Sequence, residues 1–229
     1  MTIVRIDRRF NGPPNSGNGG YFAGLLAREL GDSDVVVTLR RPAPLDEDLT
    51  IERSDDTASL HHGTQLLAVA EQAAVAIDIP APPSLEEARA AEARFKQHRH
   101  LYPGCFVCGP DRAPGDGWRI FPGRIGAKNV AASWTAAAEF ADDSGHVRPE
   151  FIWAALDCPG YFAVEDAAGL ALLGKIAVRI DAPVPAGEPL IIQGWGQGSD
   201  DRKHRAGTAL HDARGRLLAV ADQVWVSLR

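Results

Sequence analysis

Asp157 lies in surroundings that suit a general base. It belongs to the apolar stretch WAALDCPGYFA, and its neighbours one helical turn away would be Trp153, Ala154, Gly160 and Tyr161. A carboxyl group that loses its water in such surroundings has a raised pKa and accepts a proton more readily near neutral pH. We therefore predict that Asp157 is catalytic and that Trp153 and Tyr161 contact the substrate. The alternative is that Asp157 only hydrogen-bonds the backbone that Pro159 disturbs.

A glycine-rich segment, NSGNGG at 15–20, could supply the complementary group. Free N–H groups at the start of a helix stabilise negative charge that develops on a substrate oxygen. We predict that Asn15, Gly19 and Gly20 bind the substrate in this way. A flexible loop with a serine or asparagine helix cap is an equally good interpretation.

Four residues have a spacing that metal ligands can have. His98, His100, Cys105 and Cys108 form the pattern H-x-H-x4-C-x2-C, which could supply four ligands to zinc. A turn with reduced thiols explains the pattern equally well, and we expect neither a metal nor a cofactor. A Cys–His nucleophile is the weakest interpretation, because Cys158 stands beside Pro159 and the sequence places no histidine near it.

Composition and charge exclude several classes of protein. The 24 basic and 30 acidic residues give a net charge of −6, opposite to that of a nucleic-acid-binding protein. No apolar run reaches the ~20 residues of a membrane helix, and the start MTIVRIDRRF lacks the apolar centre of a secretory signal. We expect a cytoplasmic protein with reduced cysteines that binds a small molecule but neither nucleic acid nor membrane. Whether it forms a homo-oligomer stays open.

Three short segments recur in the same order and at similar offsets. GYFA at 20–23 returns at 160–163, PAPLDEDL at 42–49 returns as PVPAGEPL at 183–190, and LAVAEQ at 67–72 returns as LAVADQ at 218–223. This order predicts an internal duplication. The N-terminal repeat would span 1–80, a solvated linker helix 81–97, and the C-terminal repeat 98–229.

The elements that must position these residues follow the repeat. Each repeat should contain one helix followed by strands, with an opening strand before the helix. We expect helices at 16–30 and 149–167, and strands at 2–10, 34–41, 48–55, 57–62, 65–78, 117–125, 129–135, 172–181, 188–196, 203–212 and 215–228. The last strand of each repeat is apolar on both faces and belongs in mid-sheet. Both helices are apolar nearly all round, and glycines at 19, 20, 24 and 160 would let sheet backbone approach them.

A helix wrapped by an antiparallel sheet, present twice, resembles the double hotdog fold of acyl-CoA thioesterases. The segments HLYPGCFVCGPD at 100–111 and GDGWRI at 115–120 are similar to the opening of members of the 4-hydroxybenzoyl-CoA and phenylacetyl-CoA thioesterase superfamily. This resemblance implies an α+β fold with two antiparallel sheets, each wrapping a central helix.

The resemblance also implies site residues. In acyl-CoA thioesterase II-like proteins an Asp, a Thr and a Gln hold the attacking water, and Asp157 and Gln223 match the Asp and the Gln. No threonine matches, since the corresponding strand starts LLGK at 172–175. Within the duplication Gln72 corresponds to Gln223, but Gly17 corresponds to Asp157. A single catalytic site between the repeats is therefore expected.

The implied activity is hydrolysis of an acyl-CoA or related thioester by a water that Asp157 activates. Arg202, Lys203 and Arg205, at an expected hairpin tip, could hold the phosphates of coenzyme A, although neighbouring aspartates would equally make this a solvated tip. A non-catalytic acyl-CoA-binding protein is the main alternative. A hotdog hydratase or dehydratase is less favoured, because Phe162 stands where a histidine would be needed. The acyl group and its carrier, coenzyme A or a protein, stay open.

Overall fold

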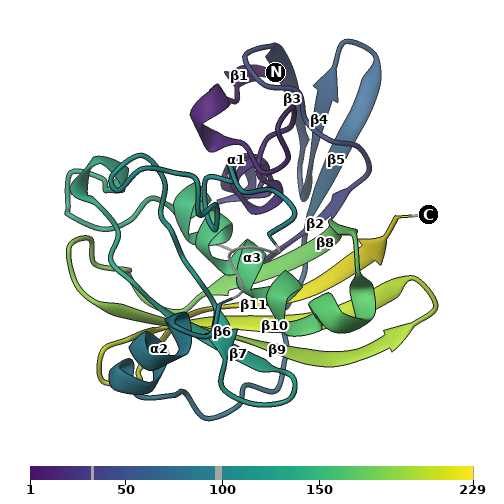
Figure 1. The fold of residues 1–229 in the computed structure, drawn as a ribbon. Coiled ribbons are helices and arrows are strands. Elements are labelled where there is room, and N and C mark those ends of the chain that lie inside the picture. The colour runs from purple at the N-terminus through teal and green to yellow at the C-terminus, as the bar shows by residue number, and fades with distance from the viewer. Residues whose placement is uncertain (32–33, 96–99, 229) are drawn as a thin grey trace.

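The strands of the protein form one continuous antiparallel sheet. The computed structural model describes residues 1–31, 34–95 and 100–228. The strand order in the described part is β1-β3-β4-β5-β2-β8-β11-β10-β9-β7-β6 (Figure 1). The strands span β1 Thr2–Arg5, β2 Val35–Leu39, β3 Asp48–Ser54, β4 Thr57–His62, β5 Gln65–Gln72, β6 Gly123–Arg124, β7 Asn129–Trp134, β8 Ala171–Ile180, β9 Leu190–Asp200, β10 Lys203–Asp212 and β11 Leu217–Ser227.

The expectation of two separate sheets is wrong. β2 pairs with β8, from Val35 opposite Val178 to Thr38 opposite Lys175, and this ladder joins the two halves. An unpaired strand edge leaves backbone N–H and C=O groups without partners, and pairing the two edges with each other satisfies them. The α+β class itself is confirmed, because the sheet carries helices on it.

Two buried helices lie against the sheet. They are α1, Gly19–Ala27, and α3, Pro149–Ala168. Proline at the first turn suits the start of α3, because its missing N–H would have no helical partner there. In α1 every residue after Gly19 is buried, as its all-round apolar sequence predicts. Short 3-10 turns occupy Arg8–Phe10, Arg28–Leu30 and Ala138–Phe140.

Gly20 and Gly24 of α1 contact the other helix rather than the sheet. A Cβ on Gly20 would lie 2.4 Å from the carbonyl oxygen of Trp153, and one on Gly24 would lie 2.7 Å from Cα of Glu150. The prediction that these glycines admit sheet backbone is therefore wrong. They allow α1 and α3 to cross at backbone distance. Gly160 does face the sheet, where the Gln223 side chain fills the space that a Cβ would need.

Apart from β6, the two halves of the sheet have equivalent strand orders when each is followed from its outer edge to the β2–β8 junction. The order is β1-β3-β4-β5-β2 in the first half and β7-β9-β10-β11-β8 in the second. β5 and β11, the last long strand of each half, both lie in mid-sheet as predicted. The recurring GYFA segments fall in α1 and α3, and the recurring glutamines fall in β5, at its last residue, and within β11. The duplication and the domain bounds derived from it stay predictions.

The segment between the halves covers the outer face of the second half of the sheet. α2, Leu85–Glu92, begins at a capping box of Ser84 and Glu87. Its Ala88 and Ala91 are buried against Ala131 and Ile191, so this linker helix is not solvated all round. None of the described helices combines the length and the apolar character needed to cross a bilayer.

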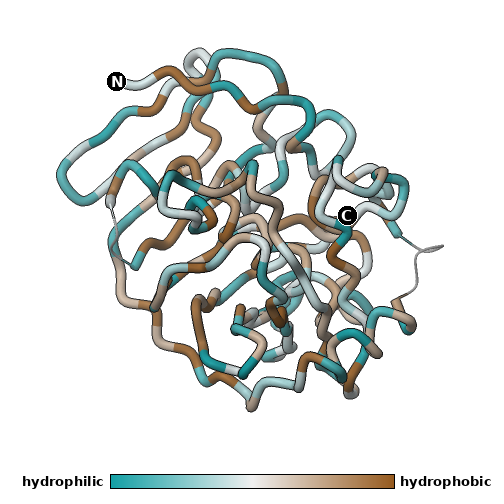
Figure 2. The backbone as a smooth tube through the Cα atoms, turned by 90° about the vertical axis from the view of Figure 1, so that its left-hand side faces the viewer, coloured by the Kyte–Doolittle hydropathy of each residue, from teal (hydrophilic) through white to brown (hydrophobic). Residues whose placement is uncertain are grey.

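Several expected strands are shorter than predicted because their backbone finds other partners. Of 117–125 only Gly123–Arg124 joins the sheet, since Trp118 and Ile120 donate to the carbonyls of Phe106 and Val107 instead. Strand 65–78 ends at Gln72, after which the chain leaves the sheet. In β3 the buried Leu49 and Ile51 alternate with more exposed residues, and hydrophobic and hydrophilic stretches are interspersed along the whole backbone (Figure 2).

Candidate functional site

A cavity of about 400 Å³ lies where the two halves meet. Its lining comes mainly from the segments 12–19, 39–42, 100–108, 157–162, 171–174 and 225–228. These segments include the start of α1, the middle of α3, the end of β2 and the start of β8. Most of the lining is apolar, and Asp157 is a buried acid in its wall. A cavity of this size suits a small organic molecule.

Asp157 is held by the opposite helix through one carboxylate oxygen. Its Oδ2 accepts hydrogen bonds from Nδ2 of Asn18 and from the backbone N–H of Gly20, both at 2.9 Å. Oδ1 is buried and has no hydrogen-bond partner among the described residues. The structural alternative, a bond to backbone freed by Pro159, is therefore wrong. One oxygen is fixed by α1, and the hydrogen-bonding capacity of the other is not used by any described group.

The pKa of Asp157 is raised to about 7. Burial is the main cause, because it disfavours the charged carboxylate, and Cys105 raises the pKa further. The hydrogen bonds from Gly20 and Asn18 act in the opposite direction. The result agrees with the direction expected from the apolar neighbours of Asp157 in the sequence.

The start of α1 faces Asp157, but with a different asparagine from the one predicted. Asn18 caps the helix by accepting from the N–H of Tyr21 at 2.9 Å, and its amide also reaches Asp157. Asn15 is exposed and does not line the cavity. The Gly20 N–H is engaged by Asp157, whereas the Gly19 N–H has no acceptor within the described residues, and Gly19 lines the cavity.

Gln223 is fully buried beneath α3 and does not line the cavity. Its Nε2 donates to the Leu156 carbonyl and, at 3.2 Å, to Oγ1 of Thr208, which itself donates to the same carbonyl at 2.9 Å. Trp225 donates to the Gln223 side-chain oxygen at 2.8 Å. Sequence reasoning missed Thr208, which lies on β10 rather than at the start of β8. Both polar side chains hold the turn of α3 that carries Asp157.

The remaining predicted residues fall in different places. Tyr161 lines the cavity, and its hydroxyl donates to the Gly169 carbonyl at 2.8 Å. Burial raises the pKa of this hydroxyl. Trp153 is buried against Gly24 and does not reach the cavity.

The predicted cations lie outside the cavity. Arg202, Lys203 and Arg205 are at the β9–β10 hairpin, where Arg205 pairs with Asp222 at 3.3 Å. Arg40 and Arg41, which sequence reasoning missed, are exposed and line both the cavity and a shallow polar recess beside it. The signal for them was the RRP motif at 40–42, which directly follows β2.

Comparison with known proteins rests on structure alone. No family model and no curated protein matches the sequence. A protein provisionally named a thioesterase from Novosphingobium aromaticivorans aligns with a TM-score of 0.65 at 14% identity, over 99% of this chain and 95% of that chain. The tesB protein of Mycobacterium avium subs paratuberculosis aligns with a TM-score of 0.63 at 14% identity, over 99% and 92%.

A third structural neighbour is described by its fold. It is a conserved protein with hot dog fold from Alicyclobacillus acidocaldarius, aligned with a TM-score of 0.65 at 12% identity over 99% of this chain and 92% of that chain. This chain has the hot dog fold. The likeness extends over both halves, so the whole of the hot dog protein described here, including α1 and α3, corresponds to these neighbours.

One more group gathers at the central helix α3 of the hot dog protein. Cys105, Cys108 and Cys158 are buried with free thiols, and their sulfur atoms all lie within 4.8 Å of one another. Nε2 of His100 lies 3.2 Å from the Cys108 sulfur. His98, the other histidine of the sequence motif, lies outside the described residues. Cys158, which the metal hypothesis had left out, thus joins Cys105 and Cys108.

Proposed function

We propose that this protein hydrolyses an acyl thioester, with acyl-CoA as the substrate class. The observation that carries the proposal is Asp157, a buried carboxyl group in the wall of an apolar cavity, with Oδ2 held by α1 and Oδ1 without a partner among the described residues. Such a group can bind and orient a water molecule. The hot dog fold shared with thioesterases supports the same activity as an analogy of fold.

The proposed reaction uses residues of both helices. A water bound to Oδ1 of Asp157 gives up a proton to the carboxylate while its oxygen attacks the thioester carbonyl carbon. The Gly19 N–H, at the first turn of α1, donates to the carbonyl oxygen as that oxygen gains negative charge. The C–S bond then breaks, and the leaving sulfur takes the proton from Asp157. The products are a carboxylic acid and a free thiol.

A panel of acyl-CoA esters of different chain length tests this function directly. We expect free thiol to be released from at least one ester in proportion to protein, together with thermal stabilisation of the protein by that ester. Stabilisation by an ester without thiol release would make the protein a binding module. If no ester is hydrolysed and none stabilises the protein, coenzyme A esters are not its substrates.

We further propose that Arg40 and Arg41 contact the phosphates of the coenzyme. Both line the cavity, and no ion pair engages either side chain among the described residues. Arginine forks match phosphate oxygens. Replacing either one with Ala is expected to raise KM for the acyl-CoA roughly 2- to 5-fold, the range for exposed charge pairs, with kcat little changed.

The matching acyl-pantetheine, which lacks the nucleotide phosphates, is the control substrate for this prediction. Its KM should not respond to Arg40→Ala or Arg41→Ala. The rival hypothesis is that the cations of the β9–β10 hairpin contact the phosphates, and Arg202→Ala and Arg205→Ala test it. If only the hairpin variants raise KM for the acyl-CoA, the assignment to Arg40 and Arg41 is wrong.

The two corresponding glutamines give a separate prediction for the one-site model. Gln223→Ala is expected to lower kcat, because it removes a fully buried donor that holds the α3 turn carrying Asp157. Gln72→Ala is the matched control, since Gln72 does not line the cavity and its amide donates to the Leu30 carbonyl. Steady-state rates for both variants decide the matter, and equal losses would contradict a single site.

A further inference from the structure

We propose that Cys105, Cys108 and Cys158 bind a zinc ion as thiolates. They are the three cysteines of the chain, and they come together from a loop and from α3, elements far apart in the sequence. The Cys105 and Cys158 sulfur atoms are 3.9 Å apart. Tetrahedral zinc with Zn–S bonds of about 2.3 Å would place its sulfur ligands about 3.8 Å from one another. The observed spacing fits that geometry.

Hydrogen-bond donors surround these sulfur atoms. The backbone N–H groups of Val107 and Cys108 donate toward the Cys105 sulfur. Nδ1 of His100 accepts the Tyr102 N–H at 3.0 Å, so the ring hydrogen is on Nε2, which faces the Cys108 sulfur at 3.2 Å. Donors directed at sulfur stabilise thiolates, the form that binds a metal. Buried thiolates need a compensating cation, and a metal ion supplies it.

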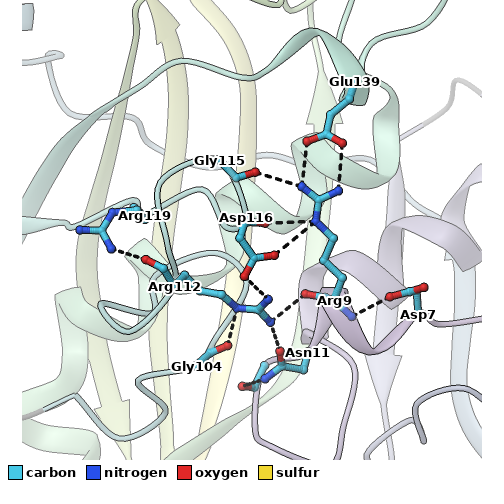
Figure 3. A network of polar contacts seen from close by, with 10 residues as sticks. Asp7, Arg9, Asn11, Gly104, Arg112, Gly115, Asp116, Arg119 and Glu139 are labelled. Carbon is cyan, nitrogen blue, oxygen red and sulfur yellow. Dashed lines mark hydrogen bonds and ion pairs between the residues drawn. The ribbon is translucent and has the colours of Figure 1, made fainter.

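The loop that carries two of the ligands is firmly anchored. The Cys105 carbonyl accepts the Gly109 N–H at 2.9 Å, and a Cβ on Gly109 would lie only 2.4 Å from that carbonyl oxygen, so the turn requires glycine. Arg112 then ties the loop to the N-terminal segment, with bonds to the carbonyls of Gly104 and Arg9 at 2.9 Å (Figure 3). The two loop sulfurs are therefore held beside Cys158 by the fold itself.

The ligand chemistry selects the metal. Three thiolates form a soft donor set that suits zinc and disfavours magnesium or calcium, which take oxygen ligands. His100 acts on this centre as a hydrogen-bond donor. All three cysteines line the cavity, so the fourth coordination position belongs to a water from the cavity. Metal content can be measured whether or not the protein hydrolyses thioesters, so this inference and the proposed function are tested separately.

Metal analysis of the full chain tests the site. The protein is produced in zinc-supplemented medium, purified without chelators and analysed by mass spectrometry of its elements. We expect one zinc ion per chain in the unaltered protein and in His146→Ala, the control, because His146 is half-buried and lies outside both the cavity lining and the cysteine cluster. Cys105→Ser, Cys108→Ser and Cys158→Ser should each lose most of the zinc. His100→Ala should retain zinc with an affinity lower by about 10- to 100-fold.

A second measurement on the unaltered protein covers variants that fail to fold. After zinc removal, titration with Co²⁺ should produce a thiolate-to-cobalt charge-transfer band in the near ultraviolet and intense visible bands of tetrahedral cobalt. Alkylation of the cysteines should be slow with zinc bound and fast after chelation. Zinc-free protein without a cobalt–thiolate band, an iron–sulfur chromophore, a Cys105–Cys108 disulfide, or serine variants that keep their zinc would each overturn the proposal.

Discussion

Asp157→Asn is expected to lower kcat for thioester hydrolysis by about 10²- to 10⁴-fold, the usual loss when a general base is removed. The amide has the size of the carboxyl group, and its oxygen can still accept the bonds from Asn18 and Gly20. It cannot accept the proton of the attacking water, so chemistry should fail while binding persists. The steady-state rate of thiol release from the best ester of the panel measures the effect.

Asp166→Asn is the matched control for this experiment. Asp166 lies on the same helix, but its side chain is 74% exposed and pairs with Arg124 at the surface. Its replacement should leave kcat unchanged, and both variants should melt close to the temperature of the unaltered protein. If Asp157→Asn hydrolyses acyl-CoA at the rate of Asp166→Asn, Asp157 is not the base.

Gly20→Ala is expected to destabilise the protein by about 1–3 kcal/mol, as overpacking in a well-packed core does. The added methyl group would lie 2.4 Å from the Trp153 carbonyl oxygen and 2.7 Å from Cβ of Asp157. To make room, α1 must move away from α3, which also lengthens the hydrogen bond from the Gly20 N–H to Asp157. Stability and kcat should therefore fall together. Denaturant unfolding and steady-state kinetics on the same preparation measure both.

Gly126→Ala provides the comparison for this substitution. Gly126 is exposed in the turn between β6 and β7, and a Cβ there would lie 3.8 Å from its nearest neighbour, an ordinary contact distance. It should leave stability and kcat near those of the unaltered protein. Equal free energies of unfolding for the two alanine variants would contradict the close crossing of α1 and α3.

Periodic sequence patterns predicted the elements well, and pairing between distant elements poorly. The bounds of β4 and β10 agree with the predicted 57–62 and 203–212, because alternating residues bounded by turns specify a strand locally. The β2–β8 ladder leaves no such pattern, since it joins backbone groups of both strands whatever their side chains. Two separate sheets were therefore expected, because the sequence does not indicate that β2 pairs with β8.

The candidate site shows the same division. Asp157 could be found because its apolar neighbours are close in sequence. Asn18 could not be told from Asn15, because the segment at 15–20 offers two asparagines and the cap depends on where α1 begins within it. Thr208 and Cys158 belong to the site only through folding, which brings β10 under α3 and places the loop at 105–108 against it.

The ladder between β2 and β8 also limits how the protein can move. Opening the two halves like a hinge would break that ladder and separate α1 from α3, whose backbones touch at Gly20 and Gly24. Ligand entry must then proceed by local rearrangement of a cavity wall. The loop that carries Cys105 is pinned by Arg112. Entry and exit should therefore follow fluctuations of the wall segments outside that loop, rather than motions of whole halves.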